Sequence, residues 1–301
     1  MVAVDDDDLQ GGSLVTPGLS TDILRSALPR QELHVDAPTP YFRQAGSGEV
    51  VVCLHANAST SSQWSALLQR LSSRFSVYAP DLLGAGRSPA PPQDRPVTLS
   101  DEVALIEPVL ALAGRPFSLV GHSYGAAVAL MAALQHVDDV RSLAVYEPTL
   151  FSLLEQESPG SAAAAGIRDA ATDAAAAIDR GEPGAAAERF LDYWMGAGTW
   201  SAMPEQRRPA IARSMAGVRG WASALFDEPT PQAAFGDLRV PVLLMIGGRS
   251  PNSSLGVARL LASVLPDVTV MEFPELGHMG PVTHPDVVGE AVEGFLERRS
   301  A

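Results

Sequence analysis

The feature that most constrains the fold of this chain is the alternation of two hydrophobic patterns. Short apolar runs rich in β-branched residues predict strands over 50–54, 75–79, 117–120, 143–146, 242–246 and 268–273. Between them, apolar residues recur at helical spacing and predict helices over 62–71, 99–112, 124–135, 255–265 and 285–298. Continuous apolar strands are typical of a parallel sheet that is covered on both faces. The alternation therefore predicts an α/β fold with a doubly wound, mostly parallel sheet.

The alternation stops in the middle of the chain, which predicts a second structural unit. That stretch is rich in Ala, helical in pattern and without a strand-like run. We therefore expect a helical cap, residues 148–235, inserted into a core formed by residues 31–147 and 236–301. A low-complexity linker is the alternative, but the Trp, Tyr and Phe side chains of this stretch are uncommon in disordered segments.

The first part of the chain has a different character from the rest. Residues 1–30 predict a flexible extension, with four consecutive aspartates at 5–8 and neither the basic nor the apolar region of a signal peptide. Residues 32–43 predict two edge strands around a turn at 37–40. Since no apolar run approaches the length of a membrane span, we expect a cytoplasmic protein that has no membrane partner.

Charge and residue usage exclude several classes of function. The formal net charge is −14, and nucleic-acid-binding proteins need clustered basic side chains, so we expect no nucleic-acid partner. All 21 basic residues are Arg, which excludes a lysine Schiff base and a P-loop lysine. The single cysteine, Cys53, lies in an apolar run typical of a core. No residue cluster has metal-ligand spacing and no dinucleotide-binding glycine motif occurs, so we expect neither a metal nor a cofactor.

A serine between two glycines is the first candidate for chemistry, in the sequence VGHSYGAA at 120–127. Ser123 follows a predicted strand and precedes a predicted helix, which is the context of a nucleophile elbow. Gly121 and Gly125 suit a turn that neighbouring elements crowd, and the helix N-terminus favours developing negative charge. A tight turn without a chemical role is the alternative, but the context favours a nucleophile at Ser123.

With three further motifs, the chain resembles the α/β-hydrolase family over about residues 32–298. These motifs are LHANASTSSQW (54–64), DLLGAGRS (81–88) and ELGHMG (275–280). Each follows a predicted strand, in the order and structural context that this family requires.

The resemblance implies a catalytic histidine just after the last strand, and His278 occupies that place. It also implies that His55 holds the oxyanion loop. For His34 and His136 we expect structural or surface roles, and His122 is the variable residue of the elbow. His284 lies near enough to be an alternative to His278, but its place at the start of the last helix favours a capping or surface role.

The catalytic acid departs from the usual pattern of the family. Most members carry Asp in the loop that is 247–252 in this chain, but this loop reads GGRSPN and holds no carboxylate. A minority, including some haloalkane dehalogenases, zearalenone lactonases and cofactor-free dioxygenases, carries the acid after the strand that follows the nucleophile helix. Glu147, in VYEPT, has that position, and we expect it to orient His278. Asp237 and Glu275 are weaker candidates, and a capping role is the alternative for Glu147.

The resemblance further implies an oxyanion hole formed by the backbone N–H groups of Asn57 and Tyr124. We expect Trp194, Trp221 and Met279 to line a substrate pocket, the alternative being that the aromatic residues only pack the cap on the core. An apolar lining favours an apolar substrate of medium size.

Together these residues predict a serine hydrolase that cleaves an ester or lactone of an apolar small molecule through an acyl-enzyme. A serine nucleophile disfavours dehalogenase and epoxide hydrolase chemistry, which use a carboxylate nucleophile in this family. One alternative is a cofactor-free dioxygenase or lyase in which His278 is the base and Ser123 only positions the substrate. A second is a non-catalytic small-molecule receptor. Ester turnover and trapping of Ser123 by a fluorophosphonate would distinguish a hydrolase from both.

Overall fold

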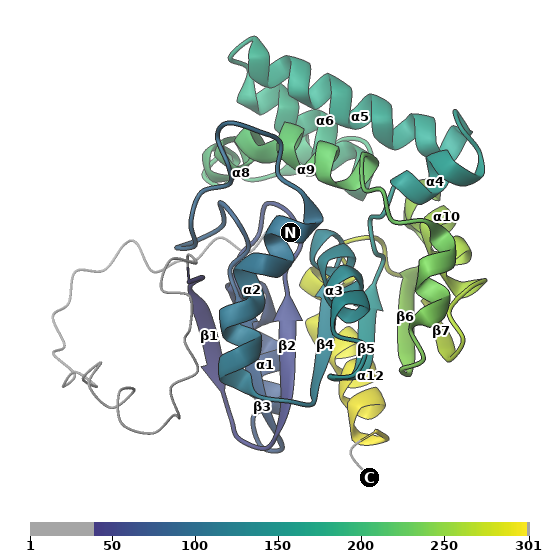
Figure 1. Cartoon of the computed structure of the whole chain (residues 1–301). Helices are drawn as coiled ribbons and strands as arrows, with labels where there is room; N and C mark the ends of the chain where they lie inside the picture. Colours follow the sequence, from purple (N-terminus) through teal and green to yellow (C-terminus); the bar gives the residue numbers. More distant parts are fainter. Residues whose placement is uncertain (1–38, 300–301) are drawn as a thin grey trace, which may run out of the picture.

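The computed structural model describes residues 39–299, which form a central sheet with helices on both faces and a further layer of helices above the strand ends (Figure 1). The extension expected over 1–30 lies outside the described residues. The same holds for most of the segment 32–43, which meets a described strand only where that strand begins, at Phe42.

Seven strands form the sheet of the described region, in the order β1-β3-β2-β4-β5-β6-β7. The strands are β1 Phe42–Ala45, β2 Glu49–Leu54, β3 Phe75–Pro80, β4 Phe117–His122, β5 Val140–Tyr146, β6 Val242–Gly247 and β7 Val268–Phe273. All neighbouring strands are parallel except β1, which pairs antiparallel with β3. The predicted α/β class with a mostly parallel sheet is therefore confirmed.

The strand order creates a switch point in the middle of the sheet. From β2 the chain moves outward to β3 and then returns across β2 to β4. The loops that follow β2 and β4 therefore leave in opposite directions. In open α/β sheets, ligands bind in the crevice that such diverging loops form at the carboxyl ends of the strands.

Helices cover both faces of the sheet, and each face has its own apolar cluster. On one face lie α1 Ser65–Leu71 and α12 Pro285–Glu297, and on the other lie α2 Leu99–Ala113, α3 Tyr124–Gln135 and α10 Asn252–Ala262. Shorter helices are η3 Ser61–Trp64, η5 Gln232–Asp237 and α11 Gly280–Thr283. In α3 ten consecutive residues from Tyr124 to Ala133 are buried, because the helix lies between the sheet and the neighbouring helices.

One strand boundary differs from the prediction for a physical reason. Strand β5 begins at Val140, three residues before the expected run. The prediction missed these residues because Arg141 and Ser142 interrupt the apolar pattern. Ser142 is nevertheless buried, and its hydroxyl group hydrogen-bonds that of Ser118 on β4 at 2.9 Å. Burying two polar groups costs little free energy when they hydrogen-bond each other. Polar residues can therefore occur in a buried strand, and hydropathy alone does not reveal it.

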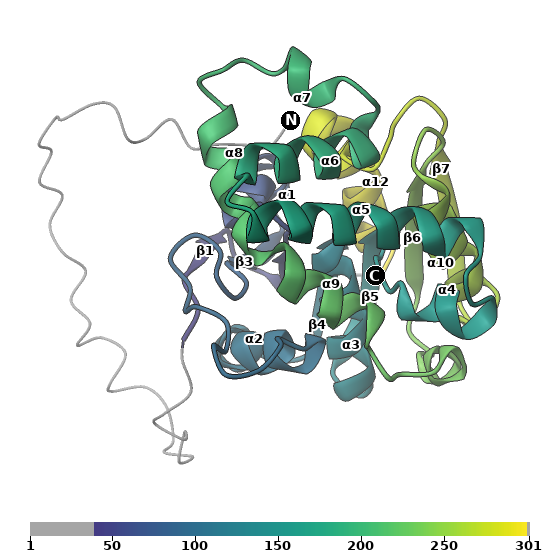
Figure 2. The same cartoon turned by 90° about the horizontal axis from the view of Figure 1, so that it is seen from above.

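Six α-helices lie between β5 and β6, and we call them the helical insert. They are α4 Ser152–Glu157, α5 Ala162–Asp179, α6 Pro183–Met195, α7 Thr199–Ala202, α8 Arg208–Ser214 and α9 Val218–Phe226, with the short η4 Met215–Gly217 before α9. Figures 1 and 2 show the insert lying across the carboxyl ends of the strands. Small Ala side chains on α5 and α6 let these two helices pack closely. The division from the core at residues 148 and 235 remains a prediction.

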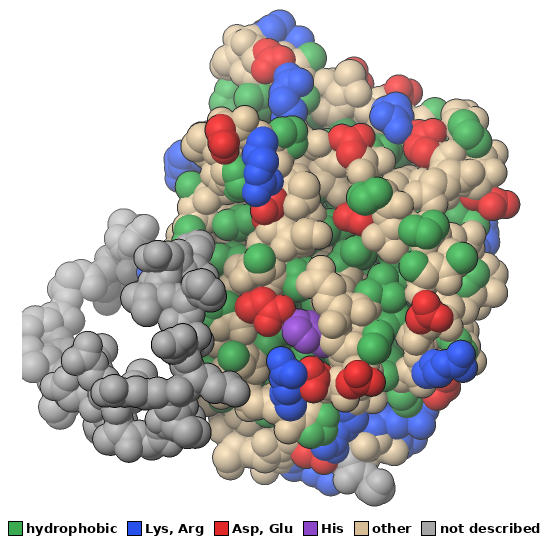
Figure 3. All heavy atoms as spheres, in the orientation of Figure 1, with side chains coloured by type: hydrophobic (Ala, Val, Ile, Leu, Met, Phe, Trp, Pro, Cys, Tyr) green, Lys and Arg blue, Asp and Glu red, His purple; other side chains and the backbone are tan. Residues whose placement is uncertain are grey.

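On the face drawn in Figure 3, the Arg side chains are interspersed with Asp and Glu. Among residues 39–299, no helix has both the length and the apolar character needed to cross a bilayer.

Candidate active site

Ser123 lies in a strained turn between β4 and α3, with φ 56° and ψ −117°. Its flanking glycines are required by close approach of the backbone. A Cβ at Gly121 would lie 2.5 Å from Ala126 Cα, and one at Gly125 would lie 2.3 Å from the carbonyl oxygen of Leu54. Positive φ at a non-glycine residue costs free energy and persists where the surrounding structure enforces it. The turn thereby projects the Ser123 side chain beyond the end of the sheet.

His278 follows β7 and lies against Ser123, although the two residues are far apart in the sequence. Its Nε2 is 2.9 Å from Ser123 Oγ, and its Nδ1 is 2.6 Å from Oε2 of Glu147. All three side chains are buried. The structure therefore joins Ser123, His278 and Glu147 in one chain of hydrogen bonds.

Glu147 is held by more than its contact with His278. Its Oε1 accepts hydrogen bonds from the Gly247 N–H at 2.7 Å and from the Ser250 hydroxyl group at 2.5 Å. Both donors belong to the segment at the end of β6, whose loop was noted in the sequence for its lack of a carboxylate. That segment therefore stabilises a carboxylate supplied by the neighbouring strand.

The weaker candidates for the acid lie elsewhere. Asp237, at the end of η5, is exposed, and exposed Glu275 pairs with Arg249. Neither contacts His278. Of the other histidines, His136 hydrogen-bonds Glu107 at the end of α3, and His284 is exposed before α12. His34 lies outside the described residues.

For the backbone N–H groups of Asn57 and Tyr124, the two expected oxyanion donors, the described region shows no hydrogen-bond acceptor. Tyr124 begins α3, where the first N–H groups have no acceptor within the helix. The neighbouring Ala56 N–H is already engaged, since it donates to Gln63 Oε1 at 3.1 Å. The Ala56 N–H is thus excluded as an oxyanion donor, and the assignment of this role to Asn57 remains a prediction.

A buried polar chain connects this loop to the elbow and to His278. Gln63 accepts from Ala56 N–H and donates through Nε2 to His122 Nδ1 at 3.2 Å. His122 in turn donates from Nε2–H to the carbonyl oxygen of His278 at 2.8 Å. Burial holds the pKa of His122 well below its ordinary value, so this imidazole is neutral, as the pattern of donors and acceptors requires.

His55 fixes the other side of the same loop. Its Nδ1–H donates to the Ala56 carbonyl at 2.8 Å, and its Nε2 accepts from Leu82 N–H at 3.0 Å. Burial lowers the pKa of His55 and keeps this ring neutral as well. The loop after β2 is thus tied to the loop after β3.

A narrow cavity of about 60 Å³ opens onto Ser123 and His278. Trp194, Trp221 and Met279, the three residues expected to line a pocket, all line it. Most of its remaining wall is apolar and comes from the helical insert and the segment before it: Phe151, Ile167, Ala171, Phe190, Val218, Ala222, Leu225 and Phe226.

Trp194 makes a further contact that the sequence does not reveal. Its indole stacks on the His278 imidazole, with ring centroids 4.0 Å apart and 25° between the ring planes. The stacked indole shields His278 from water and offers a π face to the ring when it is protonated. Gln63 and Ser250 were also missed, because a lone amide or hydroxyl side chain has no sequence signature. The nearest signal for Gln63 is its place nine residues after the strand run that ends at Leu54.

Among residues 39–299, no group of three or more His, Cys, Asp or Glu side chains is arranged to hold a metal ion. Cys53 is buried in β2, and burial raises the pKa of its thiol. The groups joined by hydrogen bonds at Ser123 are thus its own hydroxyl, an imidazole and a carboxylate.

Comparison with known proteins identifies the family of this chain. The model of the alpha/beta hydrolase family matches residues 51–291. A pimeloyl-[acyl-carrier protein] methyl ester esterase of Chromobacterium violaceum is 27% identical over 275 residues, covering 86% of this chain and 99% of that protein. A 2-(acetamidomethylene)succinate hydrolase of Mesorhizobium japonicum is 26% identical over 297 residues, covering 93% and 99%.

Solved structures show the same fold. A hydrolase from Oleispira antarctica superposes with a TM-score of 0.70 at 19% identity, covering 87% of this chain and 96% of that one. With the family model spanning most of the chain and the strand order in agreement, this protein belongs to the alpha/beta hydrolase family.

Proposed function

We propose that this protein is a serine hydrolase that cleaves carboxylic esters or lactones through an acyl-enzyme. The observation that carries the proposal is the buried chain of hydrogen bonds from Ser123 through His278 to Glu147. Asn57 lines the same cavity as Ser123 and His278, and Tyr124 directly follows Ser123, which supports their backbone N–H groups as the oxyanion donors that acyl transfer needs.

In the first step the Ser123 oxygen attacks the substrate carbonyl carbon, and His278 Nε2 takes the hydroxyl proton. The carbonyl π electrons move onto its oxygen, which then accepts hydrogen bonds from the N–H groups of Asn57 and Tyr124. Glu147 stabilises the imidazolium at Nδ1, and the face of Trp194 stabilises it from the side.

The intermediate then collapses and the bond between the carbonyl carbon and the leaving oxygen breaks. His278 gives its proton to that oxygen, which releases an alcohol and leaves the acyl group on Ser123. Water attacks this acyl-enzyme with His278 as the base, and the acid leaves. In a lactone the leaving hydroxyl group remains attached to the acyl chain.

The cavity and the relatives both support this substrate class. Aromatic and aliphatic side chains form most of the wall beside Ser123, which favours an apolar group next to the reacting carbonyl. The Chromobacterium violaceum relative is a methyl ester esterase by name, which supports an ester substrate. We expect no cofactor to be required, because each step uses only side chains and backbone groups of this chain.

Ser123→Ala tests the proposal directly. The substitution removes one oxygen and keeps the backbone of the turn, so the variant should fold while kcat for ester hydrolysis falls at least about 10³-fold. Acid release in a pH-stat measures kcat, and circular dichroism checks the fold. Near-normal turnover in this variant would refute the nucleophile and favour chemistry in which His278 acts as a base and Ser123 only positions the substrate.

A further inference from the structure

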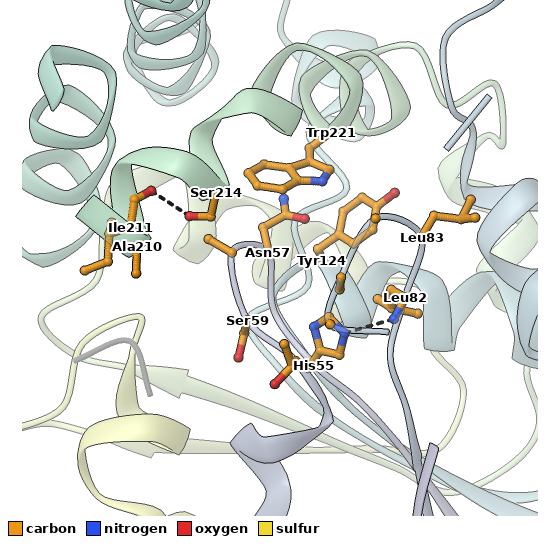
Figure 4. A pocket seen from close by; sticks show the side chains of 15 residues that line it. His55, Asn57, Ser59, Leu82, Leu83, Tyr124, Ala210, Ile211, Ser214 and Trp221 are labelled. Atoms are coloured by element: carbon orange, nitrogen blue, oxygen red, sulfur yellow. Dashed lines mark hydrogen bonds between the residues drawn. The ribbon is translucent and has the colours of Figure 1, made fainter. Parts of the chain in front are cut away.

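Trp221 stands between two cavities at the candidate active site. The narrow cavity is lined by Ser123 and His278, and a wider one of about 270 Å³ is lined by Tyr124 and by residues of α8. Asn57 and Trp221 line both cavities. Figure 4 shows the Asn57 side chain pointing toward the Trp221 indole.

The two cavities differ in how much they can hold. The narrow cavity has a volume of about 60 Å³. The wider cavity is more than four times as large. A molecule that reacts at Ser123 therefore has the most room on the side of the wider cavity, which Asn57 and Trp221 also line.

The backbone before α9 is shaped around the indole. Gly217 lies one helical turn before Trp221, and a Cβ at Gly217 would lie 2.9 Å from indole Cζ2 and 3.0 Å from Cε2. Glycine has an ordinary φ of −83° at this position, so its role is to leave room for the ring. The indole is thereby held as a partition with apolar packing on both sides.

The position of the general acid, His278, indicates which part of an ester substrate must be short, the alcohol or the acyl group. His278 must reach the leaving oxygen to protonate it, and of the two cavities only the narrow one is lined by His278. On this argument the carbon attached to the leaving oxygen occupies the narrow cavity, which Trp194 and Met279 also line. The acyl chain then takes the wider route past Trp221.

We infer that Trp221 sets the substrate specificity of this site, and that the preferred substrates are esters of short alcohols with long or bulky acyl groups. This inference rests on the proposed hydrolase function. It assigns Trp221 a role in specificity rather than in catalysis, because the indole lines both cavities and has no part in the hydrogen bonds that join Ser123, His278 and Glu147.

Two matched series of esters test the inference. One series keeps the butanoyl group and lengthens the alcohol from methyl to butyl to octyl. The other keeps the methyl alcohol and lengthens the acyl group from butanoyl to hexanoyl to decanoyl. We expect kcat/KM to fall at least about tenfold from methyl to octyl, since extra methylenes cannot enter the narrow cavity. It should change by less than about threefold across the acyl series.

Trp221→Ala joins the two cavities and should bring the methyl-to-octyl ratio of kcat/KM to within about threefold. Trp221→Leu, which keeps apolar packing but removes the ring, serves if the alanine variant does not fold. Trp200→Ala is the matched control, because Trp200 belongs to the same insert and lines neither cavity. It should leave the ratio unchanged.

The outcomes separate this inference from the proposed function. A steep loss along the acyl series instead of the alcohol series would overturn the inference. So would a methyl-to-octyl ratio that stays the same in both Trp221 variants. If wild-type protein hydrolyses no ester of either series, the proposed hydrolase function fails and the inference fails with it.

Discussion

At the residue scale, the environment of Glu147 explains how a triad forms without an acid at the usual position. Glu147 has φ 47°, a strained value that costs about 1–3 kcal/mol for a non-glycine residue. Hydrogen bonds to a charged group contribute about 1.5–3 kcal/mol each. Its carboxylate accepts from Gly247 and Ser250 as well as meeting His278, so these contacts offset the strain.

Glu147→Gln should lower kcat for ester hydrolysis by about 10²–10⁴-fold, because the variant keeps the shape but loses the charge that stabilises the imidazolium. Glu275→Gln is the matched control, since Glu275 was the alternative acid and is exposed next to Arg249. It should retain full activity. Kinetics of both variants with the same methyl ester check the prediction, and a fully active Glu147→Gln protein would remove Glu147 from the mechanism.

The sequence pointed to Ser123, His278 and Glu147 because each follows a recognisable strand, and strand ends meet along one edge of a parallel sheet. It could not point to Ser250 or Gln63. Each contributes through a hydrogen bond to one particular atom. The geometry of that bond depends on the conformation of the loop, which a hydropathy pattern does not indicate. The stacking of Trp194 on His278 was hidden for the same reason.

At the element scale, Gln63 connects three separate segments. Through Ala56 and His122 it links the loop after β2, the elbow after β4 and the backbone of His278 after β7. Each of these buried groups would be left without a partner if the amide were removed, at a cost of about 1–3 kcal/mol per group. This series of hydrogen bonds therefore fixes the loop after β2 relative to His278.

Gln63→Leu should lower kcat by about 10–10²-fold with little change in KM, because small displacements of reacting groups affect the transition state most. Gln69→Leu, an exposed amide on α1, is the control and should be neutral. Steady-state kinetics separate kcat from KM. If Gln63→Leu loses stability but keeps kcat, Gln63 supports only the fold.

Glu102 connects α2 to Tyr124, the first residue of the helix that follows Ser123. Its carboxylate accepts from Leu83 N–H at 2.9 Å and from the Tyr124 hydroxyl group at 3.0 Å. Burial raises the pKa of Glu102 from 4.5 to about 7. Between these values the folded protein retains a proton that the unfolded chain has lost, so stability falls as pH rises through this window.

Glu102→Gln should remove this pH dependence. The free energy of unfolding of wild-type protein should fall by on the order of 2–3 kcal/mol more than that of the variant between pH 4.5 and pH 8. Urea unfolding at both pH values measures the difference. Curves that run parallel would mean that Glu102 does not titrate in this range in the folded protein.

At the scale of the whole molecule, the sequence indicated the sheet and the interruption that holds the helical insert. The predicted fold class is confirmed by the strand order. It could be predicted because apolar runs of strand length leave few arrangements other than a parallel sheet. The cavities could not be predicted from the sequence. The pattern of Ala-rich amphipathic helices indicates that they pack on a neighbour, but not their angle or their height above the sheet. The wall between the two cavities depends on that placement and on the space left by Gly217.

Covalent trapping of Ser123 by a fluorophosphonate tests the central claim most directly. Intact-mass and peptide mass spectrometry should find one adduct, on Ser123, and ester hydrolysis should fall in proportion to the labelled fraction. The Ser123→Ala protein should take up no label. Hydrolysis that persists in fully labelled protein, or a label placed on another residue while Ser123 stays unmodified, would contradict a nucleophilic Ser123.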